Sequence, residues 1–150
     1  MDVRTHGLST AAPHVVWSVL SAIDAWPQWT PTVTAVTKER AEHDDLNALG
    51  SISVGSRFLV RQPPLGRATW AVTEWDEGRS FTWVSRRPAL RTIASHLVDP
   101  QDAGTRIQLT ITWVRTAVWL VRALFGRMTQ RYTDIELRSL VQAAEAESSA

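Results

Sequence analysis

The stretch DAWPQWTP, residues 24–31, holds two tryptophans and two prolines within eight residues. Pro27 and Pro31 restrict the backbone, so they are expected to end regular helical order, with at most one short turn between them. The segment is therefore expected to be a stiff elbow that carries rigid aromatic surface between two regular elements.

The residues before this elbow predict a strand followed by a helix. Residues 3–9 alternate weakly, as in a strand. A helix is expected to follow, with Ser9 or Thr10 as its N-cap and Pro13 at its first position. Its apolar stripe consists of Val16, Trp17, Leu20 and Ile23.

The residues after the elbow predict a meander of strands and one long helix. Residues 32–40 are rich in β-branched side chains and predict a strand, and residues 41–50 form an acidic, polar loop. Apolar residues then recur with period two, and strands are expected at 56–62, 67–76, 79–87, 90–98 and 104–113. The connections are short, so neighbouring strands are expected to be antiparallel. Residues 117–146 predict a helix about 45 Å long.

Composition limits the classes of function. The 150 residues are expected to form one domain, 1–150, with no cysteine and therefore no disulfide or thiolate metal site. A net charge of +1 gives no general attraction to nucleic acid, and no apolar run of membrane-spanning length occurs. We expect a cytoplasmic protein that binds no nucleic acid and has no stable membrane insertion. Eight tryptophans against one tyrosine are typical of an aromatic core or of a pocket for flat apolar ligands.

Residues 11–36, AAPHVVWSVLSAIDAWPQWTPTVTAV, resemble the start of SRPBCC-type, START-like proteins of the polyketide cyclase/dehydrase and lipid-transport group. The family begins with an alanine-proline helix start and a Val-Trp pair, and a Trp-Pro-x-Trp turn follows. Residues 55–113 resemble the same family strand by strand, most clearly in FTWVSR (81–86), SHLVDP (95–100) and GTRI (104–107). The resemblance covers nearly the whole chain. It rests on the order and spacing of the motifs, since no single motif is specific.

The resemblance implies an α+β helix-grip fold, in which a curved antiparallel sheet surrounds the long C-terminal helix and two short helices near the N-terminus plug one end. It also implies a cavity between sheet and helix that receives an apolar small molecule such as a lipid or a polyketide. The elbow would lie at one end of this cavity. Trp29 matches the family pattern best and is expected to anchor the elbow on the sheet, whereas Trp26 is expected to be freer, as a plug or a portal.

Strand alternation, together with the resemblance where alternation is ambiguous, predicts which strand residues face inward. His96 and Val98 belong to this set. The set also contains the predicted ligand-binding residues of the strands, Phe58, Val60, Gln62, Trp70, Val72, Phe81, Trp83, Ser85, Thr92, Ala94, Ile107, Leu109 and Ile111. Leu124 and Met128 are the predicted ligand-binding residues of the long helix. Such a mainly apolar set describes a small-molecule site and equally a plain core.

His96 is the best candidate for acid/base chemistry, because an imidazole titrates near neutral pH. Tyr132 on the long helix is the candidate donor to an oxyanion or enolate, and the two would serve an aldol-type cyclisation or a dehydration. The alternatives are a core histidine hydrogen-bonded to a neighbouring strand and a tyrosine that merely packs. No metal-ligand spacing and no cofactor motif is present.

Arg86, Arg87 and Arg91 gather around one predicted turn, where they form either a site for an anionic head group or a solvated face.

Three classes of function remain. The first is a module that binds an apolar small molecule, and the second is a polyketide cyclase/dehydratase. The third is a protein-interaction domain, for which Val118, Trp119 and Leu120 are the candidate contact residues. The same three residues could instead form the lip of the pocket or a dimer contact, and the chain is expected to be a monomer or a homodimer.

Overall fold

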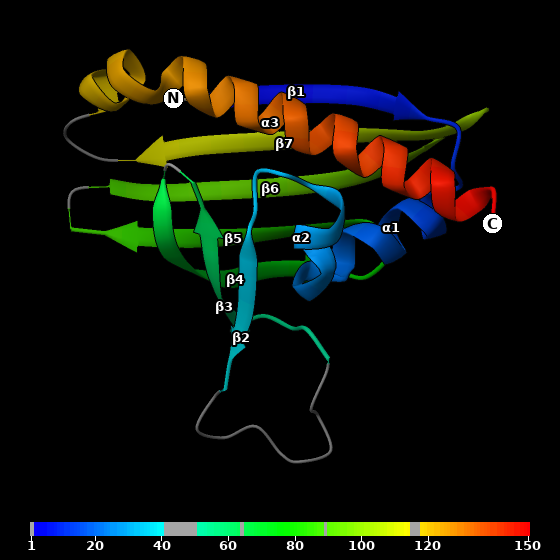
Figure 1. Cartoon of the computed structure of the whole chain (residues 1–150), viewed down its shortest axis with the longest axis horizontal. Helices are drawn as coiled ribbons and strands as arrows, with labels where there is room; N and C mark the ends of the chain where they lie inside the picture. Colours follow the sequence, from blue (N-terminus) through cyan, green and yellow to red (C-terminus); the bar gives the residue numbers. More distant parts are fainter. Residues whose placement is uncertain (1, 41–50, 64, 89, 115–117) are drawn as a thin grey trace.

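The computed structural model describes residues 2–40, 51–63, 65–88, 90–114 and 118–150, with the backbone alone at 118–122 and 124. These residues form one sheet, two short α-helices, a 3-10 turn and a long C-terminal helix (Figure 1). The α+β class, with a curved antiparallel sheet and a long C-terminal helix, is confirmed.

The sheet has seven strands in the order β1-β7-β6-β5-β4-β3-β2, and every neighbouring pair is antiparallel. The strands are β1 (Asp2–Ser9), β2 (Ala35–Glu39), β3 (Arg57–Gln62), β4 (Gly66–Asp76), β5 (Ser80–Arg87), β6 (Leu90–Gln101) and β7 (Gly104–Val114). Strands β2 to β7 follow one another as a meander, and β1 adds to the edge of β7. The predicted strands are thus present, with ends that differ by a few residues.

Two of these ends differ for visible reasons. Strand β2 begins at Ala35 rather than residue 32, because Thr30 and Thr32 are buried in a turn where their hydroxyls lie 2.9 Å apart. Strand β6 runs on to Gln101, since pairing with β7 continues until Gln101 faces Gly104 across a two-residue turn.

The helices near the N-terminus are α1 (Pro13–Ser21) and α2 (Trp26–Trp29), separated by the 3-10 turn η1 (Ile23–Ala25). Pro13 occupies the first helical position of α1, as predicted, but the predicted N-cap is wrong. The N-cap is Ala12, with no side-chain hydrogen bond, because the side chains of Ser9 and Thr10 bond the carboxylate of Glu145 instead.

The one short turn that was expected at the two prolines is present as α2, and it ends at Trp29, before extended Thr30 and Pro31. Pro27 is the second residue of α2, where its missing N–H has no helical partner to lose.

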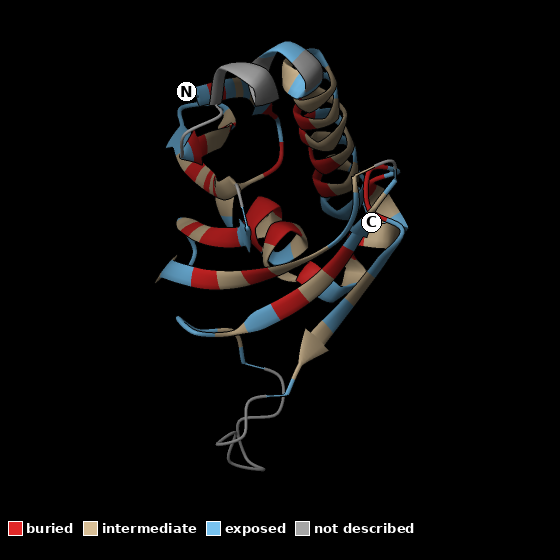
Figure 2. Cartoon of the chain, turned by 90° about the vertical axis from the view of Figure 1, so that its left-hand side faces the viewer, coloured by how far each residue is buried: buried red, intermediate tan, exposed pale blue. Residues whose placement is uncertain are grey.

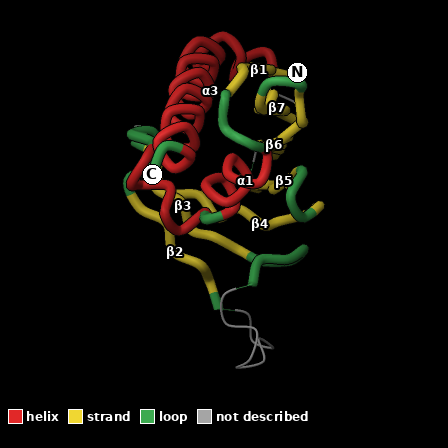
Figure 3. Tube along the Cα trace, turned by 90° about the vertical axis from the view of Figure 1, so that its right-hand side faces the viewer, coloured by secondary structure: helices red, strands yellow, loops and turns green. Residues whose placement is uncertain are grey.

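The long helix α3 (Val118–Ser148) lies along the concave face of the sheet and packs against β1, β7 and α1. Figure 3 shows the strands curving from β1 and β7 beside α3 round to β3 and β2. Buried residues recur along the strands, α1 and α3 (Figure 2). In the C-terminal half of α3 they are Thr133, Leu137, Leu140 and Ala144. The core therefore fills the space between α1 and the C-terminal half of α3, and it leaves the other end of the concave face for a cavity.

Candidate functional site

A cavity of about 460 Å³ lies between α3 and the sheet. Its lining comes from strands β3 to β7, the β3–β4 turn and one face of α3. The lining residues are Gln62, Leu65, Gly66, Ala68, Trp70, Ser85, Arg87, Leu90, Thr92, Ile111, Trp113, Phe125, Met128, Thr129, Tyr132, Thr133 and Glu136.

The floor of the cavity is a row of side chains across four neighbouring strands. Trp70 pairs with Ser85, Ser85 with Thr92, and Thr92 with Trp113. Residues paired in this way present their side chains on the same face, close together. The floor therefore has two hydroxyl groups in its middle and an indole on either side.

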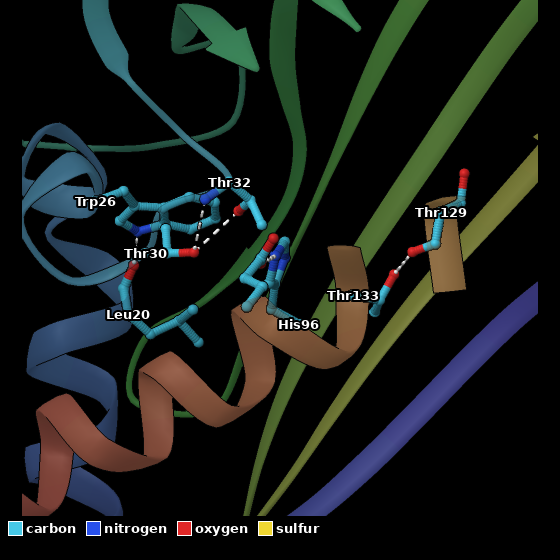
Figure 4. A network of polar contacts seen from close by, with 8 residues as sticks. Leu20, Trp26, Thr30, Thr32, His96, Thr129 and Thr133 are labelled. Carbon is cyan, nitrogen blue, oxygen red and sulfur yellow. Dashed lines mark hydrogen bonds and ion pairs between the residues drawn. The ribbon is translucent and has the colours of Figure 1, made fainter. Parts of the chain in front are cut away.

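The roof of the cavity is one face of α3. Its lining residues are Phe125, Met128, Thr129, Tyr132, Thr133 and Glu136, spaced by three, four, seven, eight and eleven residues from the first. The hydroxyl of Thr133 donates to the backbone oxygen of Thr129 at 2.7 Å (Figure 4), so it is satisfied within the helix.

The mouth of the cavity carries a cation. Arg87 is exposed at the end of β5, beside exposed Phe125 and half-buried Leu65 and Leu90. Its Nη2 donates to the backbone oxygens of Leu65 at 3.1 Å and Arg67 at 3.2 Å. These two bonds hold the guanidinium against the β3–β4 turn.

The inner end of the cavity carries a carboxylate. Glu136 lines the cavity with 15% of its side chain exposed, and its Oε1 lies 3.3 Å from Nε2 of His96. His96 itself is 4% exposed, stacks on Phe81 with ring centroids 4.3 Å apart, and does not line the cavity. Its Nδ1 is buried and has no hydrogen-bond partner among the described residues. The carboxylate of Glu136 therefore lies between the cavity and the imidazole of His96.

Tyr132 closes one side of the cavity with a hydrogen bond. Its hydroxyl donates to the backbone oxygen of Pro63, in the turn after β3. The candidate oxyanion donor is thus already engaged, and it ties α3 to the β3–β4 turn.

The elbow lies on the inner side of the site. Trp26 is 2% exposed, packs on Trp83 and His96, and donates its indole N–H to the backbone oxygen of Leu20 at 2.9 Å (Figure 4). Trp29 is half-buried, and its indole nitrogen is buried with no hydrogen-bond partner in the part of the chain that the structure describes. The expectation that Trp29 anchors the elbow on the sheet is therefore wrong, because Trp26 makes the ring contacts with Trp83 and His96 of the sheet. Of the two roles expected for Trp26, plug or portal, its burial agrees with the plug.

The predicted inward residues do face inward, but they divide between cavity and core. Those that line the cavity are Gln62, Trp70, Ser85, Thr92, Ile111, Met128 and Tyr132. Those buried in the core are Phe58, Val60, Val72, Phe81, Trp83, Ala94, His96, Val98, Ile107 and Leu109. The side chain of Leu124 lies outside the described residues, as do those of Val118, Trp119 and Leu120.

Several lining residues were missed by the sequence reasoning. They are Leu65, Gly66, Ala68, Leu90, Trp113, Phe125, Thr129, Thr133 and Glu136. Alternation through Ser85 and Thr92 extends to Arg87 and Leu90, and helical spacing from Met128 and Tyr132 extends to Phe125 and Glu136. Of the predicted arginine cluster, Arg87 lines the cavity, whereas Arg86 and Arg91 pair with each other in the next row.

The described residues bring together no group of three histidine, aspartate or glutamate side chains that could hold a metal ion. Among the same residues, no helix combines the length and the apolarity needed to cross a bilayer.

Comparison with known proteins shows what the chain is similar to. A family model described as "Polyketide cyclase / dehydrase and lipid transport" matches residues 2–145. No curated protein matches the sequence. Among solved structures, the di-domain ARO/CYC StfQ from the steffimycin biosynthetic pathway has a TM-score of 0.77 at 14% identity, over 99% of this chain and 52% of that one. The chain thus spans about half the length of that protein.

Two further solved structures match over nearly their whole length. The Zhui aromatase/cyclase from a Streptomyces species has a TM-score of 0.75 at 16% identity, over 97% of this chain and 93% of that one. A START superfamily protein from Mycobacterium smegmatis has a TM-score of 0.67 at 16% identity, over 97% of this chain and 95% of that one. At these identities the likeness shows the fold, which is the START-like helix-grip fold.

Proposed function

The chain belongs to the polyketide cyclase / dehydrase and lipid transport family, and on that premise we propose that the cavity under α3 holds an apolar small molecule that the protein carries, buffers or senses. The cavity itself supports this proposal. Its volume of about 460 Å³ lies in the range of small-molecule sites, and its walls are mainly apolar with a few polar groups.

The polar groups in the cavity are suited to orienting such a ligand. The side chains of Gln62, Ser85, Thr92 and Thr129 line it without a hydrogen-bond partner among the described residues. Trp70, Ile111, Trp113 and Met128 supply large apolar surfaces around them. A ligand with one or two oxygen atoms on an apolar body would satisfy these hydroxyls and bury its remaining surface against the indoles and the helix.

The test is to block the cavity without touching its surroundings. Thr92→Trp puts an indole on the cavity floor, and aromatic residues are well tolerated in strands. Thr110→Trp is the matched control, because Thr110 is also half-buried and lies next to inward-facing Leu109 and Ile111, hence on the other face of the sheet.

An apolar fluorescent dye, anilinonaphthalene sulfonate, serves as the probe. We expect the wild type and Thr110→Trp to bind the dye and Thr92→Trp to bind at least tenfold more weakly, with all three melting cooperatively. Equal binding by Thr92→Trp would place the dye elsewhere and count against the proposal.

A second candidate function is acid/base catalysis of a cyclisation or dehydration in the same cavity. The contact between His96 and Glu136 favours it, because a carboxylate that faces a cavity and is backed by an imidazole can take a proton from a bound substrate. Glu136 would be the catalytic residue, and His96 would act as the positioning residue that fixes its orientation. Tyr132 would have to leave the oxygen of Pro63 before it could donate to an oxyanion.

The two functions predict different effects of one substitution. With a polyketone substrate that the protein turns over, Glu136→Gln is expected to lower kcat at least a hundredfold while KM changes little. His96→Gln is expected to shift the pH profile of kcat rather than abolish turnover. If Glu136→Gln keeps full turnover, or if only KM changes, catalysis by this carboxylate is refuted and the binding function stands alone.

A further inference from the structure

The cavity carries two charged side chains among its lining residues, and they lie at opposite ends. Arg87 stands at the mouth, where it pairs with Leu90 at the start of β6. Glu136 stands at the inner end, where it contacts His96, six residues further along β6. At about 3.3 Å per residue, the stretch of β6 from Leu90 to His96 is roughly 20 Å long.

Arg87 is a cation held in place by two hydrogen bonds, and other N–H groups of its guanidinium remain available to bind a ligand. Its Nη2 is tied to the oxygens of Leu65 and Arg67, and no carboxylate pairs with it among the described residues. A guanidinium has five N–H donors, so several remain for another acceptor. The donors favour a carboxylate or phosphate group, which a guanidinium binds with two parallel hydrogen bonds.

Glu136 is the only carboxylate among the described residues that line the cavity. It contacts His96 through Oε1, and a carboxylate offers about four acceptor sites, so the group retains acceptor capacity. Burying a carboxylate without hydrogen bonds costs free energy, and Glu136 is mostly buried. A hydrogen bond from a donor on the ligand therefore contributes more binding free energy here than it would in water.

Between the two charges the lining is neutral. The floor is formed by Trp70, Ser85, Thr92 and Trp113, and the roof by Met128 and its neighbours on α3. From this arrangement we propose that the ligand is an elongated molecule with an apolar middle, an anionic group at the end that meets Arg87, and a hydroxyl group at the end that meets Glu136. The inference rests on the proposed binding function, and it names the chemical class of the ligand.

Three probes of equal chain length separate the two ends. ω-Hydroxydodecanoate carries both groups, dodecanoate carries the anion alone, and dodecanol carries the hydroxyl alone. Binding is followed by the tryptophan fluorescence of the cavity, which Trp70 and Trp113 report.

We expect ω-hydroxydodecanoate to bind about tenfold more tightly than dodecanoate, from a hydrogen bond to a charged partner. We expect it to bind about threefold more tightly than dodecanol at low salt, since Arg87 is exposed.

Variants at the two ends assign each preference to its residue. Glu136→Met is expected to abolish the preference for the ω-hydroxyl group, and Glu136→Gln to reduce it. Arg87→Gln is expected to abolish the preference for the carboxylate, and Arg87→Lys to keep it. Arg86→Gln and Glu147→Gln are the matched controls, because both residues are exposed and neither lines the cavity.

The outcomes separate this inference from the proposed function. If the three probes bind equally, or if the preferences survive in Glu136→Met and Arg87→Gln, the two-ended ligand is refuted while cavity binding stands. If no probe binds, and the dye binds equally to the wild type and Thr92→Trp, the binding function itself fails. The proposal is also overturned if the wild type prefers only one of the two end groups, because the proposed ligand requires both preferences.

Discussion

Replacing Trp26 by phenylalanine tests the structural role of the elbow. Trp26 is 2% exposed and donates to the backbone oxygen of Leu20 at 2.9 Å, between the end of α1 and the start of α2. Phenylalanine keeps an aromatic ring at this position and removes the donor. The oxygen of Leu20 then stays buried without its partner, which costs about 1 to 3 kcal/mol.

A second contribution comes from ring contacts. The indole of Trp26 lies with its centroid 5.2 Å from that of Trp83 and 5.5 Å from that of His96. The smaller ring loses part of these contacts, each worth about 0.5 to 1.5 kcal/mol, and leaves a void. Together the losses amount to about 3 kcal/mol, which lowers the melting temperature of a chain of this size by roughly 9 °C.

Trp29→Phe is the matched control, three residues along the same elbow. The indole nitrogen of Trp29 is buried without a hydrogen-bond partner in the described parts of the chain, so phenylalanine removes an unsatisfied donor as well as some apolar surface. We expect the free energy of unfolding to change by less than about 1 kcal/mol, in either direction. Urea unfolding of the two variants gives the comparison. A loss below about 1 kcal/mol for Trp26→Phe, or an equal loss for Trp29→Phe, would show that the bond to Leu20 does not stabilise the elbow.

Three further predictions concern the contact between Thr10 and Glu145, the turn between β6 and β7, and the bond from α3 to the β3–β4 turn. The N–H of Thr10 holds the pKa of Glu145 below its ordinary value. This contact is expected to stabilise the fold above about pH 4.3 and to fade as the pH falls through the lowered pKa, and in Glu145→Gln unfolding by acid should lack this component. Gly104→Ala is expected to destabilise strongly in urea unfolding, because φ is +130° and a Cβ would lie 2.1 Å from the oxygen of Ser9. A normal urea midpoint would contradict it. Tyr132→Phe is expected to speed both binding and release of the dye in stopped-flow fluorescence, since it unties α3 from the β3–β4 turn; unchanged rates would show that the bond does not restrict the mouth.

The strands could be predicted because their alternation and their turns are local properties of the sequence. Ile107, Leu109 and Ile111 alternate with polar residues along β7, and the structure turns them inward. The bulge between Val72 and Glu74 was not predicted. It places both Val72 and Trp75 on the inner side, where Trp75 packs on Phe81 at 5.5 Å. Alternation alone assigns these two residues to opposite faces, and nothing local in the sequence marks the extra residue.

The candidate site could be predicted only in part, because its division into cavity and core depends on how α3 lies over the sheet. His96 and Thr92 both point inward from β6, yet Thr92 lines the cavity and His96 lies behind Glu136. From the sequence alone, Glu136 cannot be distinguished from the other polar residues of an amphipathic helix, and only the contact with His96 sets it apart. Similarly, the donor partners of Trp26 and Tyr132 are backbone oxygens, which no sequence pattern identifies.

We propose above all that the space between α3 and the sheet is a binding cavity for an apolar small molecule. Native mass spectrometry tests it most directly, on the protein purified gently and then incubated with a lipid and metabolite extract. We expect an added mass that is retained by the wild type and by Thr110→Trp and is absent from Thr92→Trp. The same added mass on Thr92→Trp, or none on the wild type after exposure to the extract, would contradict it.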